Sequence, residues 1–203
     1  MTPKPPRRKL LRRPERRASI VSAAARAFAR TGFAATSMDD VAAEAGVTKM
    51  IIYQHFASKH DLYRAVLEQA GRRLGEAAGP DAVGFGGLQA LVTVARQAPE
   101  EFLLLFRHAA REPEFAQYAA ELDEHMVGLS EGAMAASGAD PVVARWMGRV
   151  AVRVAIESVI AWLEVGDPDR DAEFLERLRR MLHAALTAAG RTPRRSGRRK
   201  RAT

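Results

Sequence analysis

The chain has 203 residues, of which 47% are hydrophobic, and a formal net charge of +8. This length and composition predict a folded protein of one or two domains. The sequence contains no cysteine, which excludes disulfides, thiolate metal sites and thiol redox sensing. It also lacks an uninterrupted apolar run of about 18 residues, so we expect no membrane span and a cytoplasmic protein.

The positive charge is concentrated at the two ends. Residues 1–17 hold eight basic residues and one acidic residue, and residues 191–203 hold seven basic residues and no acidic one. Residues 76–190, in contrast, hold ten basic and eighteen acidic residues. A uniformly basic chain would not show this asymmetry.

Residues 1–13 are rich in Pro, Lys and Arg and offer little to bury, so we expect a disordered arm. One interpretation is a solubilising tail. The other is that the arm contacts DNA phosphates or reaches the adjacent minor groove. The basic residues concerned are Arg7, Arg8, Lys9, Arg12 and Arg13.

A first helix is predicted over Glu15–Thr31, ending at Gly32. Its inner stripe consists of Ile20, Ala24, Ala27 and Phe28.

Two serines mark the starts of further helices. Ser37 is followed three residues later by Asp40, and Ser58 is followed by Asp61 at the same spacing. This is the spacing of a capping box, with Asp in place of the usual Glu or Gln. Gly46 can end the helix that Ser37 begins, because glycine adopts the left-handed conformation without steric penalty.

A second short helix is predicted over Lys49–His55, with Thr48 as its cap. The chain therefore contains two short helices joined by a turn of about three residues. The spacing of Ala42, Gly46 and Ile52 suits two helices that cross closely, as in a helix-turn-helix. The outer face of the second helix would be costly to expose, and the DNA major groove has the right size to cover it.

From about Arg16 to Glu68 the chain resembles the N-terminal domain of the TetR family of transcriptional regulators. The resemblance depends on short motifs along this stretch, which are Ala27-Phe28, residues 32–37, Val41-Ala42, residues 45–48, residues 53–56 and Ser58-Lys59. Met50 and Ile51 are bulky where the family usually has small or polar residues.

Base readout is expected from the second short helix. Gln54 is the best single candidate, since an amide can pair bidentately with adenine, and Ile51 or Met50 could contact a thymine methyl group. The complete set expected at DNA is Thr36, Ser37, Thr48, Lys49, Met50, Ile51, Tyr53, Gln54, His55 and Lys59.

The resemblance implies phosphate contacts by Tyr53, His55 and Lys59, together with Thr48. Each of the first three also has a structural alternative. Tyr53 could brace the helix, His55 could cap a carbonyl group, and Lys59 could be a solvated residue at a helix start.

From Leu88 onward only helical patterns occur. Helices are predicted over 88–97, 100–111, 114–137 with a kink or break near Gly128, 141–165 and 172–189. Residues 141–165 are apolar on more than one face and so require cover on more than one face. This helix could be central in the monomer, but the resemblance implies that 141–165 and 172–189 pair with their counterparts in a homodimer.

A small-molecule effector site is implied by the resemblance alone. The candidate residues combine aromatic, sulfur and imidazole side chains, although filling the core is the more common role of such residues. They are Phe102, Phe106, His108, Met126, Trp146 and Trp162.

The sequence thus predicts an all-α protein with an N-terminal three-helix helix-turn-helix DNA-binding domain and a C-terminal helical ligand-binding and dimerisation domain. The expected segments are a basic arm (1–13), the DNA-binding domain (14–75), the second domain (76–189) and a disordered basic tail (190–203). The tail is an unstructured cationic segment or a non-specific DNA contact.

The expected function is that of a homodimeric repressor, released from a pseudo-palindromic DNA operator by an unidentified small molecule. No cofactor or metal is expected, because the five His residues lack ligand spacing and no phosphate loop, nucleophile elbow or dinucleotide fingerprint is present. An enzyme is therefore not expected. A basic architectural protein that coats DNA without sequence preference is a further alternative.

Overall fold

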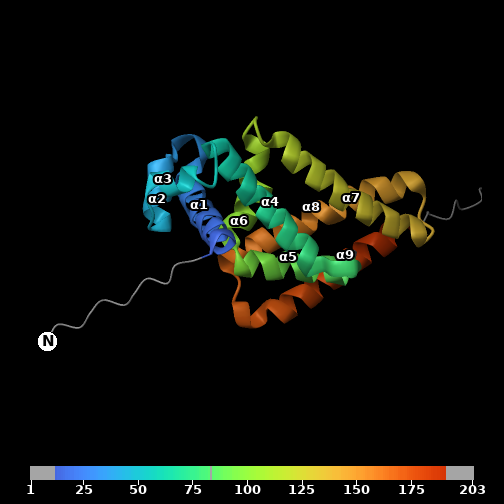
Figure 1. The fold of residues 1–203 in the computed structure, drawn as a ribbon. Helices are drawn as coiled ribbons and strands as arrows, with labels where there is room; N and C mark the ends of the chain where they lie inside the picture. Colours follow the sequence, from blue (N-terminus) through green and yellow to red (C-terminus); the bar gives the residue numbers. More distant parts are fainter. Residues whose placement is uncertain (1–11, 83, 191–203) are drawn as a thin grey trace, which may run out of the picture. The chain divides into compact units, whose positions relative to one another are not determined.

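The computed structural model describes residues 12–82 and 84–190. These residues form helices joined by short turns and contain no strand (Figure 1), which confirms the all-α prediction. In chain order the elements are α1 (Arg13–Ala35), α2 (Met38–Ala45), α3 (Lys49–Tyr53), α4 (Lys59–Ala78), η1 (Gly79–Asp81), α5 (Phe85–Gln97), α6 (Pro99–Leu103), η2 (Leu104–His108), η3 (Ala109–Arg111), α7 (Ala116–Ala136), α8 (Pro141–Val165), η4 (Pro168–Arg170) and α9 (Asp171–Gly190).

The chain divides into two compact units. The first unit contains the chain up to residue 77 together with residues 93–122, and the second contains residues 78–92 together with the chain from residue 123 onward. The sequence predicted a domain boundary between residues 75 and 76, and the first stretch of the first unit ends at residue 77. The predicted assignment of function to each domain remains a prediction.

Helix α1 begins at Arg13, two residues before the predicted start, so the predicted arm is shorter by its last residue. Most of that arm and nearly all of the predicted tail lie outside the described residues. Gly32 has φ 82° and interrupts the helix geometry, as expected of the residue predicted to end this helix. The inner stripe, which includes Ile20 and Phe28, is buried.

Aromatic rings form the centre of the first unit. Tyr63 on α4 lies with its ring centre 4.9 Å from Phe28, 5.0 Å from Phe33 and 4.4 Å from Phe115. The Phe33 and Phe115 centres are 5.1 Å apart, and their planes are nearly perpendicular. Burial raises the pKa of Tyr63. The cluster connects α1 and α4 to the segment that precedes α7.

A buried carboxylate joins three helices of the same unit. Glu101 on α6 accepts a 2.7 Å hydrogen bond from Gln69 Nε2 on α4 and a 3.4 Å hydrogen bond from Ser22 Oγ on α1. Its second oxygen lies 3.1 Å from Arg73 Nε, close enough for an ion pair but not aligned as a hydrogen bond. These contacts hold α6 against α1 and α4.

The helix predicted over residues 100–111 is not a single regular helix. Helix α6 continues into a π-helical turn, η2, and then into a 3-10 turn, η3. The widened turn buries the adjacent residues Leu104 and Leu105 together. A π-turn inside a helix is uncommon and occurs frequently at functional sites.

In the second unit, α7 and α8 cross closely. Gly148 on α8 is buried, and a Cβ atom there would lie 2.9 Å from Glu131 Cγ and 3.1 Å from the Glu131 nitrogen on α7. Helix α7 runs without a break through Gly128, where the sequence predicted a kink or break. The reason is that an exposed glycine in a helix costs only about 1 kcal/mol, which the packing against α8 can offset.

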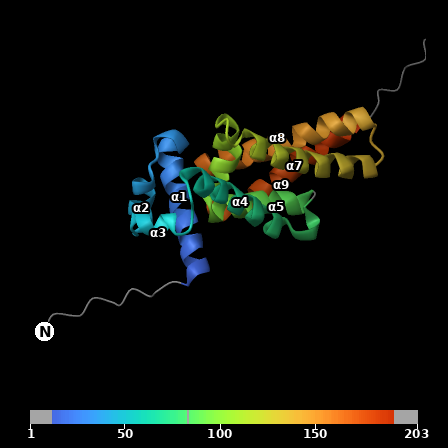
Figure 2. The same cartoon turned by 45° about the horizontal axis from the view of Figure 1, so that its top comes forward.

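Helix α8 spans the predicted residues. Its first turn is capped by Asp140, whose Oδ1 accepts hydrogen bonds of 2.9 Å and 3.2 Å from the Val142 and Val143 nitrogens. Helix α9 lies alongside α8 (Figure 2). Near the turn between them, the Trp162 ring stacks on Phe174 with ring centres 4.7 Å apart.

Candidate nucleic-acid interface

The structure confirms the local signals that place α2. Ser37 Oγ accepts a 3.1 Å hydrogen bond from the Asp40 nitrogen, and Asp40 Oδ2 accepts a 2.8 Å hydrogen bond from the Ser37 nitrogen. Asp40 Oδ2 also accepts a 2.6 Å hydrogen bond from Ser37 Oγ, and the hydrogen bonds donated by the Ser37 side chain and then by its backbone nitrogen lower the pKa of Asp40. Gly46 ends the helix in the left-handed conformation, with φ 61°. At the start of α4, the Asp61 nitrogen donates a 3.0 Å hydrogen bond to Ser58 Oγ, and Ser58 Oγ donates a 2.8 Å hydrogen bond to Asp61 Oδ2.

Helices α2 and α3 pack through Val41, Ala42 and Ile52, which are all buried. The Val47 nitrogen donates a 3.0 Å hydrogen bond to the Ala42 carbonyl oxygen and so closes the turn between the helices. This is the predicted helix-turn-helix.

Helix α3 is shorter than predicted. It ends at Tyr53, and residues 54 and 55 form a turn whose amides bond to the carbonyls of Met50 and Ile52. Thr48 occupies the cap position with an extended backbone, but its side chain makes no capping hydrogen bond and remains exposed. Its hydroxyl group is therefore available for another partner.

The outward face of α3 carries large side chains. Met50 is 72% exposed and Tyr53 is 49% exposed, whereas Ile52 on the opposite face is fully buried. Gln54 and Lys49 are also exposed, and Ile51 and His55 are half-buried. Most of the residues expected at DNA therefore share one exposed surface around α3.

Lys49 has a partner in this structure. Its Nζ lies 2.7 Å from Asp39 Oδ2 on α2, and this hydrogen bond raises the pKa of Lys49. Because both side chains are solvated, the pair is easily exchanged for a contact with a phosphate.

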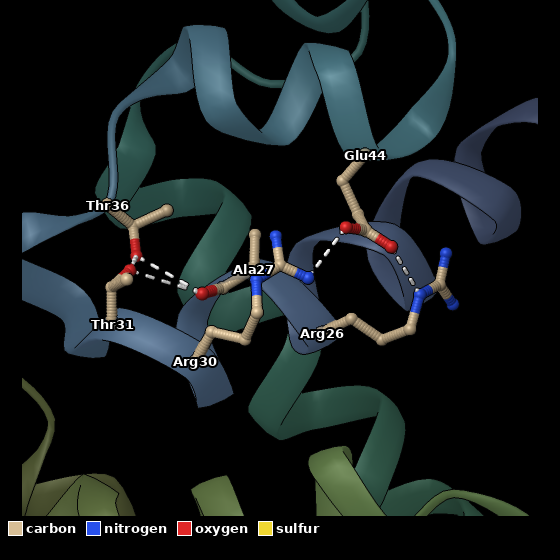
Figure 3. A network of polar contacts seen from close by, with 6 residues as sticks. All are labelled: Arg26, Ala27, Arg30, Thr31, Thr36 and Glu44. Atoms are coloured by element: carbon tan, nitrogen blue, oxygen red, sulfur yellow. Dashed lines mark hydrogen bonds and ion pairs between the residues drawn. The ribbon is translucent and has the colours of Figure 1, made fainter.

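A carboxylate fixes α2 on α1. Glu44 accepts 2.7 Å hydrogen bonds from Arg26 Nε and Arg30 Nη1, one on each of its oxygens (Figure 3). These two hydrogen bonds lower the pKa of Glu44. The pairing sets the direction in which the helix-turn-helix leaves α1.

Thr36 lies inside the protein rather than at the predicted DNA surface. Its side chain is 1% exposed, and its Oγ1 bonds to the Gly32 carbonyl oxygen at 2.6 Å and to Thr31 Oγ1 at 2.7 Å. Figure 3 shows the Thr31 and Thr36 hydroxyl groups near the Ala27 carbonyl, which precedes the break of α1 at Gly32. The side chain therefore secures the α1–α2 junction, a role that sequence spacing alone did not reveal.

Lys59 points toward the backbone at the end of α1. Its Nζ lies 2.8 Å from the Phe33 carbonyl oxygen, 3.2 Å from that of Ala34 and 3.0 Å from that of Thr36. An ammonium group has three donors, so these three contacts account for all of them. A phosphate contact by Lys59 remains a prediction, and in a complex it would compete with these carbonyls.

Sequence reasoning missed Arg16, which shares a groove with three of the residues predicted to contact DNA. The groove lies between the start of α1 and the end of α3 and has a volume of about 530 Å³. It is lined by Arg13, Arg16, Ile51, Gln54 and His55. The sequence did contain a signal for Arg16, because it follows Arg12 and Arg13 by four and three residues and so lies on the same face of a helix.

The predicted effector-binding residues fall into both units. In the first, Phe102 is buried with its ring centre 4.8 Å from that of Phe106. His108 is half-buried on the π-turn, and its pKa is lowered by burial and then by Arg111 and Arg107.

The remaining predicted effector residues belong to the second unit. Met126 and Trp162 are half-buried, and the Trp162 Nε1 donates a 2.6 Å hydrogen bond to Asp171. Trp146 is 59% exposed on α8, unlike a residue that lines an enclosed pocket.

Within the described residues, no group of three or more His, Asp or Glu side chains has the arrangement of a metal site. Nor does any helix in residues 12–82 and 84–190 have an apolar stretch of the length that crossing a bilayer requires.

Residues 20–66 match the family described as bacterial regulatory proteins, tetR family. The transcriptional activator FasR of Mycolicibacterium smegmatis is 48% identical over 59 residues, which cover 29% of this chain and 27% of FasR. The match thus spans only about a quarter of that relative.

Solved structures extend the likeness to most of the chain at the level of the fold. A TetR-like transcriptional regulator from Rhodococcus sp. RHA1 superposes with a TM-score of 0.73 and 20% identity, covering 88% of this chain and 99% of the regulator. AibR, in complex with isovaleryl coenzyme A and operator DNA, has a TM-score of 0.63 at 19% identity, covering 82% of this chain and 97% of AibR.

Proposed function

Because the chain belongs to the tetR family of bacterial regulatory proteins through its N-terminal helix-turn-helix, we propose that it is a homodimeric repressor that binds a pseudo-palindromic DNA operator and is released by a small molecule. Its place of action would be the cytoplasm, where bacterial DNA is found.

The exposed face of α3 is the observation that carries the proposal. Met50 and Tyr53 are large, partly apolar side chains left in solvent by a helix whose opposite side is fixed in the core through Ile52. A B-DNA major groove admits an α-helix and offers thymine methyl groups and base edges to such side chains. Gln54 then reads adenine, and Met50 or Ile51 contacts a thymine methyl group.

The test begins with selection of preferred duplexes from a random library by the wild-type protein. Gln54→Ala is expected to change the sequence preference by about 1–3 kcal/mol, because a bidentate amide–adenine pair is lost. Gln97→Ala removes an exposed amide from the end of α5 and serves as the control. Equal preferences of wild type and Gln54→Ala across the selected panel would refute the role of Gln54.

The proposed dimer uses the outward faces of α8 and α9. An apolar groove of about 190 Å³ runs between them, and Trp146 and Met181 are both at least half exposed nearby. The groove is lined by Met147, Val150, Ala151, Val154, Met181, Leu182, Ala185 and Leu186. An exposed apolar patch of this kind marks an interaction site, and a second copy of the chain supplies a matching one through two-fold symmetry.

Sedimentation tests the dimer. Combining Val150→Glu with Met181→Glu is expected to produce a monomer, because two charges would be buried at the interface. Phe85→Glu changes a comparably exposed apolar residue on α5 (47% exposed, against 50% for Met181) and should leave the dimer intact. A wild-type monomer at micromolar concentration would count against this part of the proposal.

Effector release would depend on residues of the first unit near the π-turn η2. It draws support from Phe106 and His108 on the π-turn and Phe102 just before it, and from AibR, which was crystallised with both an acyl-coenzyme A and DNA. The chain has two Trp residues, so Trp146→Phe leaves Trp162 as a single fluorescent reporter. A compound that releases bound duplex in a concentration-dependent way would support the proposal, and reporter expression that falls upon deletion of the protein would contradict repression.

The second candidate is a basic architectural protein, which the arginine-rich ends favour. Such a protein binds through phosphates alone. A ratio of specific to non-specific affinity near one at physiological salt would favour it over the operator-binding protein.

A further inference from the structure

The groove between α1 and α3 combines charge with access to the recognition residues. Arg13 and Arg16 of α1 line it together with Ile51 of α3 and with Gln54 and His55, which directly follow α3. A phosphate of the DNA backbone that enters this groove would therefore lie beside the side chains proposed to read bases.

The fold does not use the charges of these two arginines, although Arg16 is half-buried. Neither side chain forms an ion pair with any of the described residues, whereas Arg17 lies over the Phe56 ring, 4.8 Å from its centre. Both belong to the first residues of α1, where the helix dipole favours anions and disfavours cations. Their positions thus oppose helix stability and suit an incoming anion.

Burial and the arginines of α1 both disfavour the charged form of His55. Its pKa is lowered from the ordinary value of 6.5 by burial first and then by Arg13, Arg17 and Arg16. Of the charged groups on the neighbouring helices, Lys49 on α3 is already paired with Asp39 on α2. The cations that act on the imidazole are therefore those of α1.

We propose that Arg13, Arg16 and His55 form a binding site for one backbone phosphate of DNA, and that His55 takes up a proton when the phosphate enters. The phosphate offsets the arginine charges that disfavour the imidazolium, and the protonated ring then donates a hydrogen bond to a phosphate oxygen. This inference rests on the proposed DNA-binding function and adds two features to it, the role of Arg16 and the proton linkage.

The proton linkage has a definite sign. In the free protein the pKa of His55 is lowered, and in the proposed complex the phosphate raises it. Affinity for DNA therefore increases as the pH falls from the higher of these two pKa values to the lower, and below both it no longer changes through this group.

The test uses a mixed-sequence DNA duplex of about 30 base pairs at about 50 mM salt, where phosphate contacts dominate. Calorimetry in two buffers of different ionisation enthalpy is expected to show uptake of up to one proton per protomer by the wild type. His55→Gln should abolish that uptake, whereas His183→Gln, which changes an exposed histidine on α9, should retain it.

The arginines are tested by the salt dependence of binding to the same duplex. Arg16→Gln is expected to lower the slope of log affinity against log salt by about one, with an unchanged or higher melting temperature. Arg64→Gln, on the exposed side of α4, is the matched control and should not change the slope. A lower melting temperature in Arg16→Gln would show that Arg16 serves the fold, and would overturn its role here.

The outcomes separate this site from the proposed function. If the wild type does not bind duplex DNA under these conditions, the proposed function fails. If it binds, but Arg16→Gln keeps the full slope or His55→Gln keeps the proton uptake, the phosphate site is overturned while DNA binding stands.

Discussion

The ammonium group of Lys59 lies 4.5 Å from the centre of the Phe33 ring and 2.8 Å from the Phe33 carbonyl oxygen. One side chain at the start of α4 thus satisfies the backbone at the end of α1 and covers an aromatic ring of the core. Carbonyl groups at a helix end need such donors, because no later residue of the helix supplies them.

Replacement of Lys59 by alanine is expected to lower the free energy of unfolding by about 1–3 kcal/mol, since the carbonyls lose a charged donor. Chemical denaturation measures this loss, and Arg64→Ala provides a control on the exposed side of the same helix. Full stability of Lys59→Ala would show that these carbonyls find other donors.

Salt dependence of DNA binding then separates the two roles of Lys59. A lost phosphate contact would lower the slope by about one, whereas a role confined to the end of α1 would leave the slope unchanged.

Glu101 is expected to be a strong determinant of stability in the first unit. Glu101→Ala leaves Gln69 and Arg73 without their buried partner, and should lower the free energy of unfolding by about 2 kcal/mol. Glu101→Gln keeps an acceptor for Gln69 and should cost less. If Gln and Ala at this position were equally destabilising, the charge rather than the hydrogen bond would be the important feature.

Local signals allowed much of the fold to be predicted. The exchange between Ser37 and Asp40, the left-handed Gly46 and the limits of α8 all depend on residues a few positions apart, and the structure confirms them. Fixed backbone geometry links such short spacings to structure, so one sequence is enough to read them.

Contacts between residues distant in sequence could not be predicted in this way. The partners of Lys59 lie 23 to 26 residues away, at the end of α1 and directly after it. Thr36 was missed for a different reason, since its acceptor, the Gly32 carbonyl, lies only four residues earlier, but the sequence does not show that the side chain turns toward it. The groove that contains Arg16 exists only once α1 and α3 are packed together.

Acidification is expected to weaken the native state through His108. The pKa of His108 is lowered in the folded protein. Its imidazole is therefore mostly neutral in both the folded and the unfolded state above about pH 6.5, whereas below this pH the unfolded state binds more protons. Stability therefore declines as the pH falls from about 6.5 toward the lower, folded-state pKa. His108→Gln should reduce this decline in denaturation experiments at pH 7 and pH 5, and an unchanged decline would show that other groups control it.

Two glycines in the second unit should respond oppositely to alanine. At Gly148 the new Cβ would lie 3.1 Å from the Glu131 nitrogen on α7, so the helices must move apart, at a cost of about 1–3 kcal/mol. At Gly132 a Cβ meets nothing within 4 Å, and alanine should raise the stability by about 0.5–1 kcal/mol because it favours the helix. Thermal and denaturant unfolding of the two variants measure both effects, and a stabilised Gly148→Ala protein would contradict the close crossing of α7 and α8.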